Sequence, residues 1–290
     1  SDAIYDTQRQ CYWLAVNSAG ICKLTNQGRQ FFVPAGPISN YGYRLKYIGN
    51  ELFIAGGERW AIQKQRPGNF SIYNGKTWRK MYASTAQNAL GLLPRDVVSF
   101  AGKADEPGHF FAACYGQGVY EYKDYKPINR YTPDNSTLLS AVPTSPNNFT
   151  RTEGAMIDDQ GNLWVLNTSN SESPINVMQP NGQWTGIPMR VNGSNITLWT
   201  PWEITMDQRD NRHKWIVDQR YDPAVYLFYD NGTPTNNTDD RCVKRKEFYD
   251  QDNIQLMPAN IYCLVQDKNN DIWIGTPAGI IIIPSTVDFF

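Results

Sequence analysis

The sequence predicts an all-β protein, and three observations lead to this prediction. Charged residues make up 19% of the 290 residues and aromatic residues 13%, whereas soluble domains average about 25% charged residues. Abundant aromatic residues, asparagine and glycine suit short strands joined by tight turns. A unit of short apolar strands separated by polar turns also recurs along the chain. The one short helix candidate, at residues 84–93, ends before Pro94.

The clearest copy of this unit occupies residues 256–283. A β-rich run at 261–266 precedes the polar turn 267–271, and a second strand follows at 272–276. A third strand at 280–283 is apolar throughout, which predicts that it is buried on both faces. The unit is therefore a small antiparallel meander of strands.

One aromatic residue opens the second strand of each copy and marks the period of the repeat. These markers are 40 to 58 residues apart: Trp13, Phe53, Phe111, Trp164, Trp215 and Trp273. Propeller blades run to about 40–50 residues, with insertions in their loops. A single meander cannot bury both of its faces, but radially stacked meanders can. We therefore predict one β-propeller domain over residues 1–290, with six or seven blades. The marker aromatics, four of which are tryptophans, are predicted to be structural residues between blades.

The two ends of the chain predict that the propeller is incomplete. The last unit supplies three strands, and the first unit already has its own first strand at 3–7. The last sheet then lacks an outer strand, unless residues 1–4 or 287–290 supply it. We expect the chain to be an excised part of a longer protein. No apolar run approaches the roughly 18 residues of a membrane span, so no span is predicted.

Charge and residue counts exclude several classes of function. The chain has 27 basic and 28 acidic residues, a net charge of −1, which argues against nucleic-acid binding. No pair of the five cysteines forms a C-x-x-C motif. Cys11 and Cys22 could form a disulfide from neighbouring strands, although five buried free thiols are the simpler interpretation. His109 and His213 are too few for a multi-histidine metal site. We predict neither an enzyme nor a cofactor.

Two local patterns have a structural and a functional interpretation. The turn formed by Asp158, Gly161 and Trp164 resembles the Asp-box of sialidases, which is a structural hairpin turn away from the active site. Carboxylates at Asp230, Asp239 and Asp240 could crowd around a calcium ion. Their spacing does not fit an EF-hand loop, so a solvated loop is favoured over a metal site.

Ligand binding is assigned to three aromatic residues in the later part of the chain. Trp199 and Trp202 precede a predicted strand and could form an apolar ledge at one mouth of the propeller, with Tyr221 as a third candidate. Aromatic rings of this kind suit stacking on a carbohydrate. Ordinary packing between blades is the alternative interpretation.

The repeat resembles a known family. The pattern V-x-x-I-x-x-D-x-x-G-x-I-W-I-G-T-x-x-G-I is matched best at residues 261–280 and well at 155–167. It resembles the two-component-regulator propeller repeat, which occurs in extracytoplasmic proteins of Bacteroidetes. Asn270 replaces the turn glycine of the family, and asparagine tolerates the left-handed conformation.

A longer stretch, residues 203–283, looks like the propeller region of PorZ-like proteins of type IX secretion systems. That resemblance implies an exported periplasmic, outer-membrane or surface protein that acts as a non-catalytic scaffold in secretion and attachment. Its implied partners are other surface proteins, including a sortase-like peptidase, and polysaccharide or anionic lipopolysaccharide. An oligosaccharide-sensing ectodomain of a hybrid two-component system is the alternative, and a propeller glycosidase or lyase is a remote one.

Overall fold

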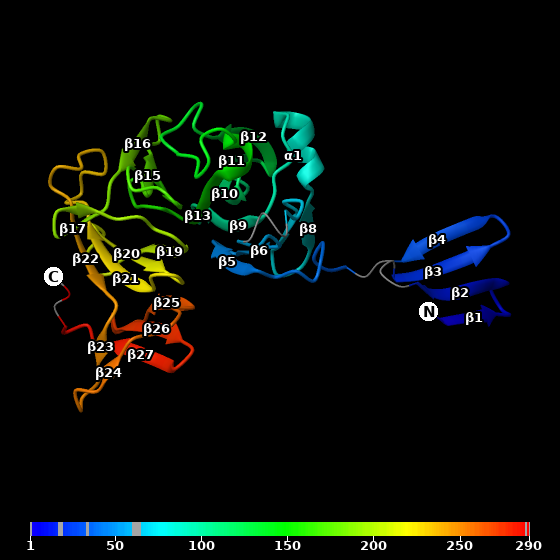
Figure 1. Ribbon diagram of the computed structural model, residues 1–290. Helices are drawn as coiled ribbons and strands as arrows, with labels where there is room; N and C mark the ends of the chain where they lie inside the picture. Colours follow the sequence, from blue (N-terminus) through cyan, green and yellow to red (C-terminus); the bar gives the residue numbers. More distant parts are fainter. Residues whose placement is uncertain (1, 17–19, 33–34, 60–64, 288, 290) are drawn as a thin grey trace.

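The computed structural model describes residues 2–16, 20–32, 35–59, 65–287 and 289, and nearly all regular elements in it are β-strands (Figure 1). The strands form six antiparallel meanders, which we number sheets 1 to 6 in chain order. In the third and fourth meanders, β10 also pairs with the start of β13, so these two sheets are continuous there. The prediction of an all-β propeller fold is confirmed.

The bounds of the elements are as follows. Sheet 1 contains β1 (Asp2–Asp6), β2 (Cys11–Val16), β3 (Gly20–Thr25) and β4 (Gly28–Phe32). Sheet 2 contains β5 (Arg44–Ile48), β6 (Glu51–Ala55), β7 (Phe70–Tyr73) and β8 (Trp78–Met81), followed by helix α1 (Ala83–Leu90). Sheet 3 contains β9 (Val97–Gly102), β10 (Phe110–Gly116), β11 (Gly118–Lys123) and β12 (Lys126–Tyr131), followed by helix α2 (Pro146–Phe149).

The second half of the chain continues the series. Sheet 4 contains β13 (Thr150–Ile157), β14 (Leu163–Asn167), β15 (Ile175–Met178) and β16 (Trp184–Ile187), followed by the hairpin β17 (Arg190–Val191) and β18 (Ser194–Asn195). Sheet 5 contains β19 (Pro201–Met206), β20 (His213–Asp218), β21 (Ala224–Tyr229) and β22 (Arg241–Arg245), followed by the hairpin β23 (Phe248–Tyr249) and β24 (Gln255–Leu256). Sheet 6 contains β25 (Cys263–Gln266), β26 (Ile272–Thr276) and β27 (Gly279–Ile283).

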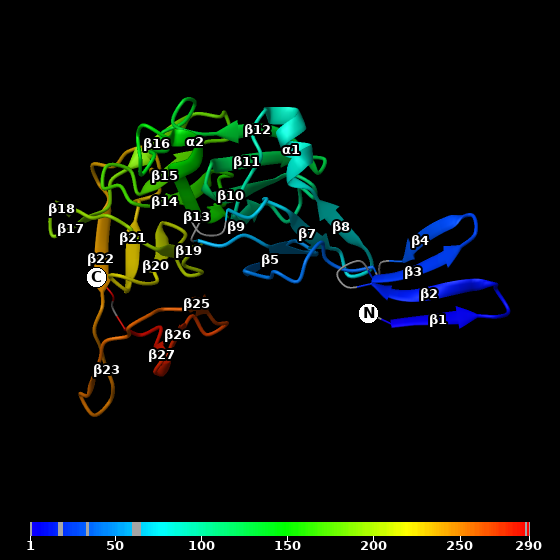
Figure 2. The same ribbon diagram turned by 45° about the vertical axis from the view of Figure 1, so that its right-hand side comes forward.

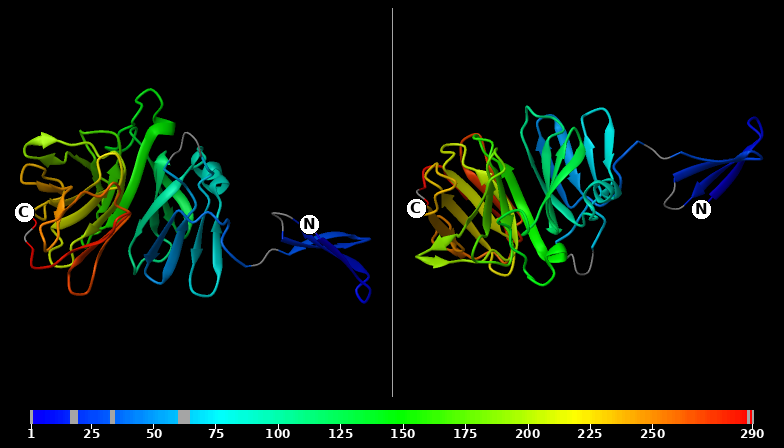
Figure 3. Two further views of the ribbon diagram at one scale, coloured as in Figure 1. Left: turned by 60° about the horizontal axis from the view of Figure 1, so that its bottom comes forward. Right: turned by 90° about the horizontal axis from the view of Figure 1, so that it is seen from above.

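Sheets 2 to 6 lie side by side in an arc (Figures 1 and 3), and we refer to the central axis of this arc as the channel. The first strand of each sheet is innermost, and successive first strands contact one another from β5 through β9, β13 and β19 to β25. We call the side where these strands begin the N-terminal mouth of the channel and the side where they end the C-terminal mouth. The ends of four of them surround a hollow of about 770 Å³ at the C-terminal mouth.

Sheet 1 stands apart from the arc in every view (Figures 1, 2 and 3). Of its described apolar residues only Cys11 and Cys22 are buried, and Ile4 and Ile21 are 68% and 52% exposed. None of its residues belongs to the four hydrophobic clusters of the molecule. Whether residues 1–290 form a single propeller domain therefore stays a prediction.

The core of the arc consists of layers between neighbouring sheets, and four of the six marker aromatics lie in these layers. Each marker is in the second strand of its sheet. Four of them face the following sheet: Phe53 packs on Phe100, Phe111 shares a cluster with Leu163, Trp164 contacts Phe228, and Trp215 shares a cluster with Ile272. Trp273 is 38% exposed, because in the described chain no sheet follows sheet 6.

Several predicted details are wrong for reasons visible in the packing. Ile280 and Ile282 of β27 are 67% and 47% exposed, so this strand is buried on one face only. The helix ends at Gly91, not at Pro94, because Gly91 takes a left-handed φ of 80° and its amide caps the carbonyl of Gln87. All five cysteines are free, and Cys263 is exposed rather than buried.

The strand pairing also shows whether the ends of the described chain supply an outer strand to sheet 6. Among the described residues β1 pairs with β2 only, so residues 2–4 do not extend the last sheet, and Ser1 lies outside the described residues. In the described chain β27 has β26 as its one neighbour, and Phe289 packs on Trp215 without forming a strand. No helix among the described residues is long and apolar enough to cross a membrane.

Candidate functional site

The turn before each marker tryptophan has the same hydrogen bond. An aspartate carboxylate in the turn between the first and second strands accepts the indole N–H of the marker. The four pairs are Asp6–Trp13 at 3.3 Å, Asp158–Trp164 at 2.8 Å, Asp207–Trp215 at 2.9 Å and Asp267–Trp273 at 3.1 Å. In sheets 4 and 5 the Asp-box-like turn thus fixes, at the C-terminal mouth, a tryptophan that is buried in the core.

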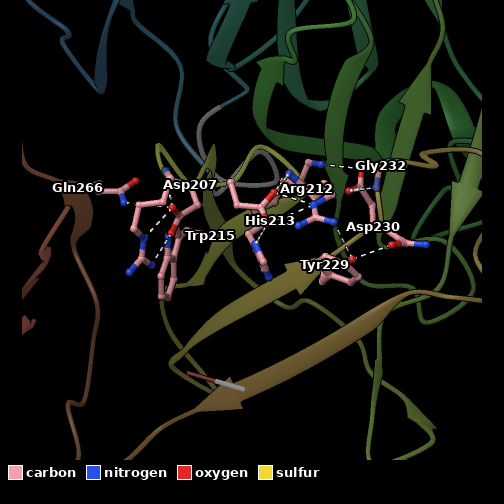
Figure 4. A network of polar contacts seen from close by, with 12 residues as sticks. Asp207, Arg212, His213, Trp215, Tyr229, Asp230, Gly232 and Gln266 are labelled. Atoms are coloured by element: carbon pink, nitrogen blue, oxygen red, sulfur yellow. Dashed lines mark hydrogen bonds and ion pairs between the residues drawn. The ribbon is translucent and has the colours of Figure 1, made fainter. Parts of the chain in front are cut away.

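Asp207 has the most extensive of these networks (Figure 4). Its carboxylate accepts hydrogen bonds from Arg209 at 2.8 Å and Trp215 at 2.9 Å, and from Gln266 of the next sheet at 3.3 Å. Burial alone would raise the pKa of Asp207, but these hydrogen bonds outweigh it and lower the pKa to about 2. The turn therefore holds a fixed negative charge that links sheets 5 and 6.

Two of the predicted ligand-binding aromatics, Trp199 and Tyr221, lie on two loops of sheet 5 at the N-terminal mouth, and Trp202 lies at the start of β19. Asp218 ties these loops together: it accepts the backbone amide of Trp199 at 2.9 Å and the hydroxyl of Thr200 at 2.7 Å. The Thr200 hydroxyl also lies 2.8 Å from the carbonyl of Arg220, next to Tyr221. Trp199 and Tyr221 project from these loops and are 50% and 71% exposed.

Trp202 is partly buried and packs against the hydrophobic cluster between sheets 5 and 6. Its ring lies against the guanidinium groups of Arg44 and Arg59, with distances of 4.7 and 5.5 Å from the guanidinium carbons to the ring centre. Tyr43 meets the same indole edge-on at 5.3 Å. The structure therefore places Trp199 and Tyr221 on the rim of the mouth, and Trp202 inside the channel as a cation–π partner.

A cluster of ionic side chains, of which Arg44, Arg59 and Glu153 are buried, joins sheets 2, 4 and 5 near the N-terminal mouth. The Arg59 guanidinium makes a two-point contact with the carboxylate of Glu153, at 2.6 and 2.7 Å, and also donates to Gln219 at 2.6 Å. Arg44 of β5 contacts Glu203 of β19 across the channel, and Lys46 lies 3.5 Å from the same carboxylate. We call Arg44, Lys46, Arg59, Glu153 and Glu203 the channel cluster.

Burial and the mutual attraction of the two groups both shift the pKa values of Arg59 and Glu153. Their side chains are 3% and 1% exposed. Burial alone would lower the pKa of Arg59, but the Glu153 carboxylate outweighs it and the net shift is upward. Burial raises the pKa of Glu153, and Arg59 offsets part of that shift. The pair links sheets 2 and 4, whose strands lie far apart in the sequence, so no local motif predicted it.

Two of the three possible calcium ligands contact protein groups, whereas the Oδ2 atom of Asp240 is buried without a hydrogen-bond partner among the described residues. Asp230 accepts the Lys214 ammonium at 2.6 Å, and Asp239 accepts the side-chain amide of Asn231 at 2.9 Å. Asp230 lies beside Tyr229 in the network of Figure 4. Across the described residues, no three or more His, Cys, Asp or Glu side chains gather in a group that could hold a metal ion.

The two histidines lie beside carboxylate groups. The ring nitrogens of His109 lie 3.0 Å from Glu106 and 2.9 Å from Glu121. His213 lies 3.2 Å from Asp210 and its ring packs on Tyr229 at 4.9 Å. These contacts tie turns to strands, and they do not resemble a nucleophile with its general base.

Comparison with known proteins agrees with the repeat and the fold. Residues 255–278 match the family described as two component regulator propeller. No curated protein sequence matches the chain. Among solved structures, PorZ of Porphyromonas gingivalis, a surface component of its type-IX secretion system, matches with a TM-score of 0.80 and 22% identity over 95% of this chain.

Two further structures share the architecture at lower similarity. The extracellular domain of the hybrid two-component system BT3049 of B. thetaiotaomicron has a TM-score of 0.52 and 16% identity over 98% of this chain. The WD40 propeller of Doa1 has a TM-score of 0.50 and 12% identity, with 99% of this chain and 78% of that one covered. The chain spans 37% of the PorZ chain and 33% of the BT3049 chain. It therefore contains a two-component-regulator propeller repeat at residues 255–278 and has a β-propeller fold similar to that of PorZ.

Proposed function

We propose that this chain is a non-catalytic binding module of an exported bacterial protein that assists type IX secretion and attachment at the cell surface, as a PorZ-like protein would. The observation that carries the proposal is the match to PorZ, with a TM-score of 0.80 over 95% of the chain. The BT3049 domain, which would favour the oligosaccharide-sensing alternative, reaches 0.52.

The N-terminal mouth is the surface that we assign to partner binding. The Arg59–Glu153 pair of the channel cluster is buried beside this mouth, so a partner would contact the exposed side chains of the rim. Trp199 and Tyr221 lie on that rim, and Tyr41 is 58% exposed with the Arg66 guanidinium 4.0 Å from its ring centre. Exposed aromatic rings beside arginine suit an anionic glycan or an acidic protein surface. An anionic lipopolysaccharide and a sortase-like peptidase are the partners we propose.

Binding assays with rim variants test this proposal. Binding of purified anionic lipopolysaccharide and of the sortase-like peptidase would be measured by biolayer interferometry for the natural chain and for the double variant Trp199→Ala, Tyr221→Ala. We expect the double variant to lose at least tenfold in affinity for one of these partners. Tyr249→Ala is the matched control, because Tyr249 is 60% exposed on the hairpin β23–β24, away from the rim.

Two results would reject the proposal. Unchanged affinity in the rim variant would exclude this mouth as the binding surface. Release of sugar fragments from the lipopolysaccharide by the natural chain would show that the module is an enzyme. A histidine kinase in the same reading frame would favour the sensor alternative instead.

A further inference from the structure

The hollow at the C-terminal mouth has the dimensions of a small-ligand site. Its volume of about 770 Å³ lies within the range of about 300–1,000 Å³ that such sites occupy. The ends of β5, β9, β13 and β19 line it, together with residues of the turns that follow β13 and β19. It lies at the opposite mouth from Trp199 and Tyr221, so the proposed partner-binding rim does not use it.

The walls of the hollow are built partly from strand edges. Met156 and Ile204 line it, but both side chains belong to the hydrophobic cluster between sheets 4 and 5, so these strands turn their backbone toward the hollow. In the described chain the ends of β5, β9, β13 and β19 each pair with one strand only. The free edge of a strand presents N–H donors and C=O acceptors. The walls therefore suit a ligand that both donates and accepts hydrogen bonds.

Polar side chains of two turns and one exposed aromatic ring complete the hollow. The side-chain amide of Asn211 donates to the Asp159 carboxylate at 3.1 Å, which joins the turns of sheets 5 and 4. A carboxylate beside an amide offers acceptors and a donor at adjacent positions, as two neighbouring hydroxyl groups require. Tyr47, near the end of β5, lines the same hollow and is 69% exposed. Its ring has an apolar face that can pack on the C–H groups of a sugar.

The charges at the hollow cancel one another. Asp207 pairs with Arg209 at 2.8 Å, and Asp210 pairs with Arg212 at 2.7 Å. Burial lowers the pKa of His213, which lies beside Asp210, so this ring adds no charge at pH 7. Among the described residues that line the hollow or pair with its lining, carboxylates and cations are equal in number: Asp159, Asp207, Asp210 and Glu203 against Arg44, Lys46, Arg209 and Arg212. The hollow therefore favours a ligand without net charge.

We propose that this hollow binds a short, uncharged oligosaccharide. Each sugar hydroxyl both donates and accepts hydrogen bonds, which matches the strand edges and the Asp159–Asn211 pair. A peptide would need a long stretch of one strand edge, whereas each of the four strands contributes only two or three residues here. The inference does not depend on the partner proposed for the N-terminal mouth.

Saturation-transfer difference NMR on the full chain tests the site. Maltotriose, cellotriose and mannotriose are the neutral probes, and trigalacturonate is an acidic probe of the same length. We expect at least one neutral trisaccharide to receive saturation from the protein. Trigalacturonate should bind about tenfold more weakly than that sugar or worse, because its carboxylates lose water without meeting an excess of cations.

Asp159→Ala and Tyr47→Ala are the decisive variants. Both side chains are exposed, so we expect the variants to fold and the Kd for the neutral trisaccharide to rise about tenfold in each. Asp105→Ala is the matched control, because Asp105 is exposed in the corresponding turn of sheet 3, between β9 and β10, and does not line the hollow. The rim variant Trp199→Ala, Tyr221→Ala should also keep the natural Kd, which separates a failure at this mouth from a failure at the other.

The outcomes separate the sugar from its alternatives. Absence of saturation transfer to all three neutral trisaccharides would show that the hollow holds only water and would overturn the proposal. Binding that survives both Asp159→Ala and Tyr47→Ala would place the sugar elsewhere and reject the site. Equal or tighter binding of trigalacturonate would overturn the assignment of an uncharged ligand.

Discussion

The hydrogen bond from the Trp164 indole to the Asp-box-like turn is expected to stabilise the protein in addition to the burial of the ring. Trp164 is fully buried and donates to Asp158 at 2.8 Å. Trp164→Phe keeps an aromatic ring but loses this bond and leaves a small cavity, so we expect a loss of about 2–3 kcal/mol in unfolding free energy. Trp273→Phe is the control: its hydrogen bond is 3.1 Å long and the residue is 38% exposed, so we expect less than about 1 kcal/mol. Urea unfolding measures both, and equal losses would contradict the assignment.

We expect removal of one charge of the Arg59–Glu153 pair to cost more unfolding free energy than removal of both charges. Glu153→Gln leaves the Arg59 guanidinium buried without its counter-charge, so we expect a loss of about 3–5 kcal/mol in unfolding free energy. The double variant Arg59→Met, Glu153→Met removes both charges and should recover most of that loss. Urea unfolding of the three proteins measures the coupling. Additive losses would mean that the two side chains do not act as a pair.

At the scale of single elements, the loop between β21 and β22 predicts a pH dependence. The Oδ2 atom of Asp240 is buried without a hydrogen-bond partner among the described residues. Burial, followed by the charges of Asp230 and Asp239, raises the pKa of Asp240 to about 7. Between about pH 4 and 7 the folded chain therefore retains a proton that the unfolded chain has released. The contribution of Asp240 to stability falls as the pH rises through this window and is constant above it.

Asp240→Asn tests this dependence by removing the titrating group. We expect the variant to lose less stability than the natural chain between pH 5 and pH 7.5, as measured by urea unfolding at both values. Burial also raises the pKa of Asp96, to about 6. The contribution of Asp240 is therefore the difference in the pH dependence of stability between the natural chain and the variant. Asp239→Asn should flatten the dependence less. An unchanged slope in Asp240→Asn would show that this carboxyl titrates normally.

Local sequence patterns predicted the elements well because a strand and its turn are encoded within about 20 residues. The strand at 272–276 was predicted with its observed bounds, and Asp158 was predicted to lie in a structural turn. The channel cluster was missed because its groups come from different sheets: Arg59 and Glu153 are 94 residues apart. Burial of β27 was mispredicted for a related reason, since only a neighbouring sheet decides which faces of an apolar strand are covered.

At the scale of the whole molecule, the separation of sheet 1 from the arc predicts unequal stability along the chain. Core strands such as β9 and β14 are buried along almost their entire length, whereas β1 and β4 have no buried residue among those described. A sheet with few buried contacts opens at a lower free energy than the core. We therefore expect amide hydrogens of β2 and β3 to exchange at least about 100-fold faster than those of β10 and β14, a difference of about 2.7 kcal/mol in opening free energy. Hydrogen exchange followed by mass spectrometry measures both regions in one sample. Equal protection would show that sheet 1 packs on other blades in solution, as the prediction of a single domain over residues 1–290 requires.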